Sequence, residues 1–218
     1  WGGRMKKLIS VPYIDQTKEY PTGCESISAV MLLAYLGISV SPDEFIEYYL
    51  EQEPMQKKDG KLYGPHPCTG FAGSPYDSES FGCYAPVIVR ALNRVFADRR
   101  VQLRADDVTG MEMEELLKRF INRDMPVIFW ASIDLKETVP GPDWLLSDGS
   151  LFTWISNEHC MLLVGYDEKS YYFNDPWKNH GCIAYDKKLV EMRHAEQYAM
   201  AVSVADAEDG SCIRQKNE

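Results

Sequence analysis

The chain has 218 residues, of which 45% are hydrophobic, and a formal net charge of -10 at pH 7. This length and composition fit one large domain or two small ones with a substantial core. The acidic balance and the absence of a concentrated basic run argue against nucleic acid or an anionic membrane surface as a partner. The longest apolar runs, residues 29–36 and 125–133, are too short to span a bilayer, so we expect a soluble protein.

The N-terminus carries no secretory apolar region, because Met5, Lys6 and Lys7 lead directly into residues 8–14, which are predicted to form the first strand. If Met5 is the native start, we expect a cytoplasmic protein; a removed signal peptide and secretion are the alternative. Six cysteines are too sparse for a disulfide scaffold, which favours free thiols.

The first half of the chain is predicted to be mainly helical. Apolar residues recur at helical spacing over residues 24–36, and Gly37 closes that helix. Ser41, Pro42 and Glu44 form a capping box with proline at the first helical position, so a second helix begins there and ends near Leu50. Further helices are predicted over residues 85–96 and 111–121.

Residues 53–83 lack periodicity and are rich in glycine, proline and aromatic residues. A loop of this length inside a compact domain is usually functional, so we interpret it as a cover over the active-site groove.

The last part of the chain is predicted to form a sheet. After a strand at residues 101–104 and a continuous apolar strand at 126–133, short strands follow at 160–166, 171–174, 181–185 and 198–204. Because helices come first and only one short helix, residues 188–195, interrupts these strands, the pattern favours an α+β fold with an antiparallel sheet. We expect a single domain over residues 1–205 and a frayed polar tail over 206–218.

Cys24 lies where an irregular loop becomes an apolar helix. The partial positive charge and unpaired N–H groups of a helix N-terminus favour the thiolate, which is the nucleophilic form of cysteine. Gln16, eight residues upstream, has a side-chain N–H suited to stabilising an oxyanion. These two residues predict a cysteine hydrolase.

The base of such a site is expected at His159, which begins a strand. If this strand forms a hairpin with the next one about Asp167, residues whose numbers sum to 334 face each other, and His159 lies opposite Asp175. A slip of one residue would present Asn174 instead. We prefer Asp175 as the residue that orients the imidazole.

The order of Gln16, Gly23-Cys24-Glu25, Glu158-His159-Cys160 and Asn174-Asp175-Pro176 resembles the papain-like cysteine peptidases. More closely, it is similar to the bacterial double-glycine peptidases that process bacteriocin leaders, family thirty-nine of the cysteine peptidases, in their soluble peptidase-like branch. The segment 80–87 also resembles that branch, and the resemblance covers about residues 11–204.

The resemblance implies a papain-like fold and a peptide or protein substrate. It further implies a thiolate–imidazolium pair of Cys24 and His159, with Asp175 orienting the ring and Gln16 lining the oxyanion hole beside the Cys24 N–H. The family usually has six residues from the glutamine to the cysteine, whereas this chain has eight, which places Gln16 in question. No cofactor is implied, and the oligomeric state stays open.

Three alternatives remain. The fold can serve as a catalytically inactive peptide-binding module, or the same thiolate can act in an amidase or acyl transferase. A zinc site is the third alternative, because histidine and cysteine occur in three close pairs: His66 with Cys68, His159 with Cys160, and His180 with Cys182. None of these pairs has the spacing of a zinc knuckle.

Overall fold

The computed structural model describes residues 6–208, which include the first strand, Lys7–Leu8. Its main sheet is antiparallel and has the order β12-β11-β10-β7-β13-β6, with β1 added against β10. The strands are β1 (Lys7–Leu8), β6 (Leu103–Asp107), β7 (Val127–Ser132), β10 (Glu158–Tyr166), β11 (Ser170–Asp175), β12 (Gly181–Asp186) and β13 (Ala201–Asp206). All six residues of β7 are buried, as its continuous apolar sequence predicts for a central strand.

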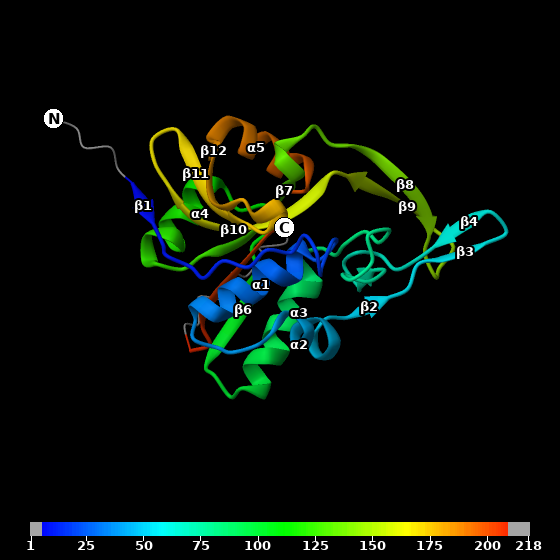
Figure 1. Ribbon diagram of the computed structural model, residues 1–218, viewed down its shortest axis with the longest axis horizontal. Coiled ribbons are helices and arrows are strands. Elements are labelled where there is room, and N and C mark those ends of the chain that lie inside the picture. The colour runs from blue at the N-terminus through cyan, green and yellow to red at the C-terminus, as the bar shows by residue number, and fades with distance from the viewer. Residues whose placement is uncertain (1–5, 209–218) are drawn as a thin grey trace, which may run out of the picture.

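The α-helices lie around this sheet. They are α1 (Cys24–Tyr35), α2 (Pro42–Glu44), α3 (Ala85–Asp98), α4 (Met113–Arg119) and α5 (Lys187–Glu196). Single turns of other helix types are η1 (Phe45–Tyr49), η2 (Ile121–Arg123), η3 (Ile133–Leu135) and η4 (Trp177–Asn179). In the view of Figure 1, α1 and α3 lie in the lower part of the molecule, near β6, and α5 lies at the top. Ten residues of α1 are buried, and the helix packs against β10 and β7, which fixes the position of its first residue.

A second sheet extends to one side of the body (Figure 1). Its order is β3-β4-β8-β9, with β3 (Gln56–Lys58), β4 (Lys61–Tyr63), β8 (Val139–Leu145) and β9 (Leu151–Ser156). A short parallel pair, β2 (Gln52–Glu53) and β5 (Phe71–Ala72), lies near its base. The prediction that residues 53–83 form a structureless loop is therefore wrong. Their strands are short, and pairing with a distant segment stabilises them, which local patterns do not reveal.

Several predicted boundaries also change. The strand expected over residues 8–14 is reduced to the pair Lys7–Leu8; Pro12, further along, has no N–H for a ladder. Ser41 does cap a helix through a bond from the Glu44 N–H of 3.1 Å, but α2 ends after three residues and continues as the π-turn η1. The strand expected at 101–104 begins at Leu103 and continues to Asp107.

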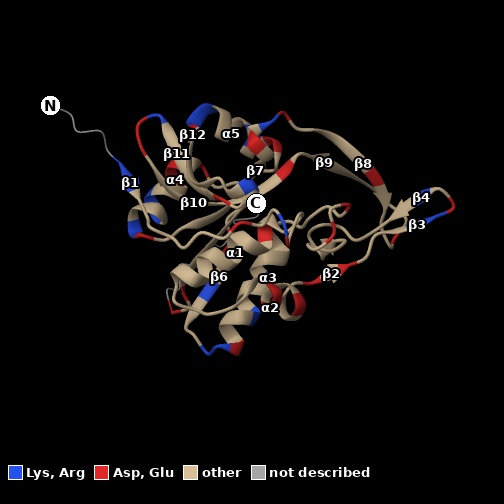
Figure 2. Cartoon of the chain, in the orientation of Figure 1, with Lys and Arg blue, Asp and Glu red and all other residues tan. Residues whose placement is uncertain are grey.

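The expected tail also begins too early, because Asp206 still pairs with Leu103 as the last residue of β13. Residues 209–218 of that prediction lie outside the described residues. Acidic residues occur on several elements of the body and of the second sheet (Figure 2). Within the described part of the chain, no helix is long and apolar enough to cross a membrane.

Candidate active site

Cys24 is the first residue of α1, as the sequence predicts. Gly23 precedes it and has no side chain that could cap the helix. A Cβ at this position would lie 2.9 Å from the Cβ of Tyr20 and 3.2 Å from that of Pro75. Only glycine therefore lets the preceding loop close tightly onto the helix start. The cysteine is 5% exposed. Burial first, and then the negative charge of Glu25, raises the pKa of the Cys24 thiol well above its ordinary value.

The thiol of Cys24 contacts two groups. It lies 3.3 Å from Glu25 Oε2 and accepts the Cys160 N–H at 3.4 Å. Among the hydrogen bonds of the described residues there is none between Cys24 Sγ and the imidazole of His159. The backbone N–H that contacts the sulfur belongs to Cys160, the residue directly after His159. The thiol therefore lies against the β10 backbone next to His159.

His159 and Asp175 form a buried pair. Nε2 of His159 lies 2.7 Å from Oδ1 of Asp175, and the two residues are 1% and 0% exposed. Oδ1 also accepts the Trp177 N–H at 3.0 Å, and Oδ2 accepts the Tyr185 hydroxyl at 2.7 Å. Burial raises the pKa of Asp175, but the charge and hydrogen bond of His159 and the other two donors outweigh it, so the pKa lies below its usual value. The carboxylate is held ionised.

Tyr185 was not recognised from the sequence. It lies on β12, where Gly181 is the direct partner of Asp175 and has no side chain to compete for the carboxylate. Two-residue alternation places positions 181 and 185 on one face of that strand. Strand alternation was therefore the signal that could have identified it.

The predicted register of the β10–β11 hairpin is wrong, although the contact that it predicted is present. The strands pair Leu162 with Asn174 and Leu163 with Phe173, so the numbers sum to 336 rather than 334. A bulge at Val164 then shifts the register, and Gly165 pairs with Tyr172. His159 therefore lies diagonally from Asp175 rather than directly opposite, on the same face and within reach of a hydrogen bond.

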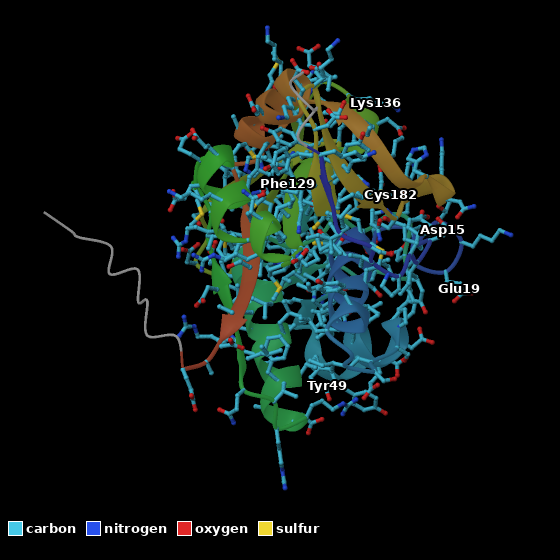
Figure 3. The ribbon with its side chains drawn as sticks, turned by 90° about the vertical axis from the view of Figure 1, so that its left-hand side faces the viewer. Asp15, Glu19, Tyr49, Phe129, Lys136 and Cys182 are labelled. Atoms are coloured by element: carbon cyan, nitrogen blue, oxygen red, sulfur yellow. The ribbon has the colours of Figure 1, made fainter. Side chains whose placement is uncertain are left out.

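Gln16 is buried beside this pair but faces its own loop. Its backbone N–H donates to the carbonyl of Pro176, which follows Asp175, at 2.9 Å. Its side-chain Nε2 donates to the carbonyls of Tyr20 at 3.2 Å and Pro21 at 3.3 Å. The carbonyls of Tyr20 and Pro21 thus bind the amide group that would serve an oxyanion. Figure 3 shows Asp15 and Glu19 on the same loop, and Asp15 accepts the Asn179 N–H at 3.0 Å.

The second half of the segment expected to cover the groove lies against the loop before Cys24. The Thr22 hydroxyl donates to the carbonyls of Ser74 at 3.1 Å and Asp77 at 2.9 Å. Phe81 packs on Trp144 and Trp154 of the second sheet, with ring centroids 4.8 and 5.8 Å apart. This segment therefore joins the second sheet to the start of α1.

The remaining histidines do not enter this site. His180 pairs with Asp134 at 2.9 Å near the surface. His66 lines an open, mainly apolar cavity of about 310 Å³ beside Tyr84 and Phe152. His194 is buried: it stacks on Phe129, and its Nδ1 lies 2.7 Å from the Trp130 carbonyl oxygen. Burial lowers the pKa of His194 to about 4.

One group of possible metal ligands occurs among the described residues. The three His/Cys pairs do not assemble, and the donor atoms that gather are those of Cys24, Glu25 and Glu158, within 4.8 Å of one another. Five cysteines, Cys24, Cys68, Cys83, Cys160 and Cys182, are free thiols. Because the two glutamates interact through a hydrogen bond, we interpret the cluster as a pair of acids and not as a metal centre.

The fold is that of the papain-like cysteine peptidases, with the cysteine at a helix start packed on an antiparallel sheet. The chain belongs to the Peptidase_C39 like family, whose model matches residues 8–205. The expected fold class and the resemblance to this family are thereby confirmed, and the chain is a cysteine-peptidase-like protein.

Two bacterial proteins are similar to it over most of its length. A Bacillus anthracis protein whose crystal structure is assigned to the C39-like peptidases has a TM-score of 0.78 and 27% identity, over 92% of this chain and 98% of that one. The uncharacterized protein YvpB of Bacillus subtilis (strain 168) is 25% identical over 177 residues, which are 80% of this chain. The match spans 66% of the length of YvpB, just under two thirds.

Proposed function

We propose that this chain is a thiol hydrolase that cleaves a peptide or amide bond of a peptide or protein substrate, with Cys24 as the nucleophile. The observation that carries the proposal is the buried hydrogen bond between His159 and Asp175, whose histidine directly precedes the residue that contacts the Cys24 thiol. Family membership supports the same reading.

His159 is the base in this proposal. Because Nε2 faces Asp175, Nδ1 is the nitrogen left to take the proton of the thiol. The ionised Asp175 holds the ring in one orientation and stabilises the imidazolium that forms, and the hydroxyl of Tyr185 keeps that carboxylate in place.

The reaction then follows the usual course of a cysteine hydrolase. The thiolate of Cys24 attacks the substrate carbonyl, and negative charge develops on its oxygen. The backbone N–H of Cys24 at the helix start and the side chain of Gln16 stabilise this oxyanion. His159 returns its proton to the leaving amine, and water then hydrolyses the thioester and regenerates the thiol.

Two side chains have to change conformation for this cycle. Cys24 Sγ turns about its Cα–Cβ bond from Glu25 toward His159, and the Gln16 amide leaves the carbonyls of Tyr20 and Pro21. Catalytic contacts are often loose without substrate and tighten when it binds. The segment around Ser74 and Asp77, bonded to Thr22, is the part of the cover that a substrate would displace.

Alkylation with iodoacetamide near neutral pH tests the proposal, with each cysteine followed by mass spectrometry of its peptide. We expect Cys24 to react faster than Cys182, whose side chain is exposed, and His159→Ala to slow the reaction of Cys24 alone. A Cys24 that labels slowly and independently of His159 would contradict catalysis and favour the peptide-binding module. The products formed from a peptide mixture then distinguish a peptidase from an amidase or acyl transferase.

A further inference from the structure

Two glutamates beside Cys24, Glu25 fully buried and Glu158 partly buried, have no part in the proposed catalytic cycle. Glu25 follows Cys24 on α1, and Glu158 precedes His159 on β10. One carboxylate oxygen of each glutamate and the Cys24 sulfur all lie within 4.8 Å of one another. Glu25 is 0% exposed. Glutamates are rarely fully buried, so a fully buried Glu25 with a second carboxyl group beside it, against one thiol, requires an explanation.

The surroundings hold this pair firmly. Glu25 Oε1 accepts the Cys83 N–H at 2.9 Å, while Oε2 faces the thiol. A Cβ on Gly82 would lie 3.1 Å from Glu158 Oε2 and would clash directly with Glu25 Oε1, so glycine leaves the space that the two carboxyl groups fill. Glu158 Oε1 is buried and has no hydrogen-bond partner among the described residues.

The charges around the pair do not include a close cation within the described part of the chain. The titratable groups that face it are Cys24 from α1, Cys83 and Tyr84 before α3, and Cys160 from β10. Arg90 of α3 acts on Cys83 but forms its own hydrogen bonds with Glu51 and the carbonyls of Cys68 and Thr69. Two uncompensated carboxylates cannot both stay ionised in such a place.

The two acids therefore share protons. Burial, as the largest cause, raises the pKa of Glu158 well above its usual value, and a hydrogen bond to Glu25 adds to the shift. Burial also raises the pKa of Glu25, to about 7, so the first proton leaves the pair near neutral pH. With Glu158 still protonated, the charge that appears is on Glu25, the residue in contact with the Cys24 thiol.

We propose that Glu25 and Glu158 are positioning residues that form a proton-sharing pair and determine the pH range in which Cys24 becomes a thiolate. The inference rests on the proposed role of Cys24 as nucleophile. When both glutamates are protonated, the neutral Glu25 carboxyl group tolerates a thiolate beside it. When Glu25 ionises, its oxygen, 3.3 Å from the sulfur, would repel a thiolate, and it accepts a hydrogen bond from the thiol, which keeps its proton.

The test is the pH dependence of Cys24 alkylation by iodoacetamide from pH 5 to 9, in the unmodified chain and in Glu25→Gln, Glu158→Gln and the exposed control Glu168→Gln. In the unmodified chain the rate should fall as the pH rises past about 7, whereas an ordinary thiol becomes faster. Glu25→Gln should abolish this fall and react about tenfold faster at pH 8, which is the effect of one pKa unit. Glu158→Gln should keep the fall but shift its midpoint, because Glu25 still titrates and has lost the acid with which it shares protons.

The variants also separate this role from packing. Both substitutions preserve shape in the same pair, so a structural effect would change both profiles alike and overturn the proposal. A Glu25→Gln profile identical to that of the unmodified chain would overturn it as well. Infrared difference spectra across pH 7 give an independent readout: a protonated carboxyl band should be lost on raising the pH, and should be absent in Glu25→Gln.

The two failures are distinguishable. If the infrared band titrates but Cys24 labels slowly and independently of His159, the proposed catalytic role of Cys24 is wrong. If Cys24 labels rapidly and requires His159, but its profile ignores Glu25→Gln, the proton-sharing role is wrong.

Discussion

Nε2 of His159 and Oδ1 of Asp175 lie 2.7 Å apart although the two residues are not direct partners in the β10–β11 ladder. The bulge at Val164 is the cause. Without it, the register of Tyr166 with Tyr171 would continue along the hairpin and put Asn174 on the face of His159. The extra residue returns Asp175 to that face. A carboxylate, rather than an amide, therefore meets the imidazole.

Removing this carboxylate should impair the base. We expect Asp175→Ala to reduce hydrolysis about 100-fold and to slow the alkylation of Cys24, because the imidazole loses both its orientation and its counter-charge. Asp134→Ala is the matched control, since Asp134 pairs with His180 at 2.9 Å near the surface. Equal rates for Asp175→Ala and the control would show that the pair does not assist Cys24.

Tyr185→Phe should remove one of the hydrogen bonds to the Asp175 carboxylate and leave those from His159 and Trp177 in place. Loss of a hydrogen bond to a buried carboxylate should lower the free energy of unfolding at pH 7 by about 1–2 kcal/mol. The lowered pKa of Asp175 means that its stabilisation is present above its unfolded value of 3.8 and is lost as the pH falls through the folded value. The difference from the unmodified chain should therefore shrink at the lowest pH, as measured by urea unfolding. Tyr166→Phe, whose hydroxyl donates to the uncharged amide oxygen of Asn122, should not show this pH dependence.

Gln16→Ala should separate two reactions of Cys24. Attack on p-nitrophenyl acetate develops an oxyanion, whereas alkylation by iodoacetamide does not. We expect the variant to lose about 10²-fold in the first reaction and to keep the second within a factor of two. Equal losses in both would instead point to Gln16 as a structural part of the loop, where its amide bonds the carbonyls of Tyr20 and Pro21.

Gly82→Ala should disturb the two glutamates. The added methyl group meets Glu25 and Glu158, so we expect a loss of about 1–3 kcal/mol in the free energy of unfolding and a changed pH profile of Cys24 alkylation. Gly70→Ala is the control, because a Cβ there makes ordinary contacts of 3.6 Å or more. A profile unchanged by Gly82→Ala would mean that the glutamates do not depend on this space.

His194 should make stability depend on pH. Its pKa of about 4 in the fold, against 6.5 when unfolded, means that the neutral ring stabilises the fold above pH 6.5 and that this contribution is lost as the pH falls toward 4. Glu25, with a raised pKa, acts in the opposite direction, so the comparison has to be made against a variant. The stability advantage of the unmodified chain over His194→Gln should fall by about 2 kcal/mol between pH 7 and 5. His180→Gln, which changes a surface ring, should leave that pH dependence in place.

The positions of the helices and of the main strands follow from the sequence because their signals are local. Helical spacing defines α1, and a continuous apolar run defines β7. The second sheet could not be predicted in this way. Its strands β3 and β4 are short and polar, and β4 pairs with β8 far along the chain, so no local pattern marks them.

For the candidate site, the sequence by itself determined the types of residue and their order: a cysteine at a helix start, a histidine at a strand start, and an acid before Pro176. The tertiary structure decided how they meet. The bulge at Val164 places Asp175 on the face of His159. The carbonyls of Tyr20 and Pro21 accept hydrogen bonds from the Gln16 amide. The packing of α1 against β10 brings Glu25 and Glu158 close to Cys24. Local sequence determines secondary structure, but hydrogen-bond partners and pKa values depend on segments that only folding brings together.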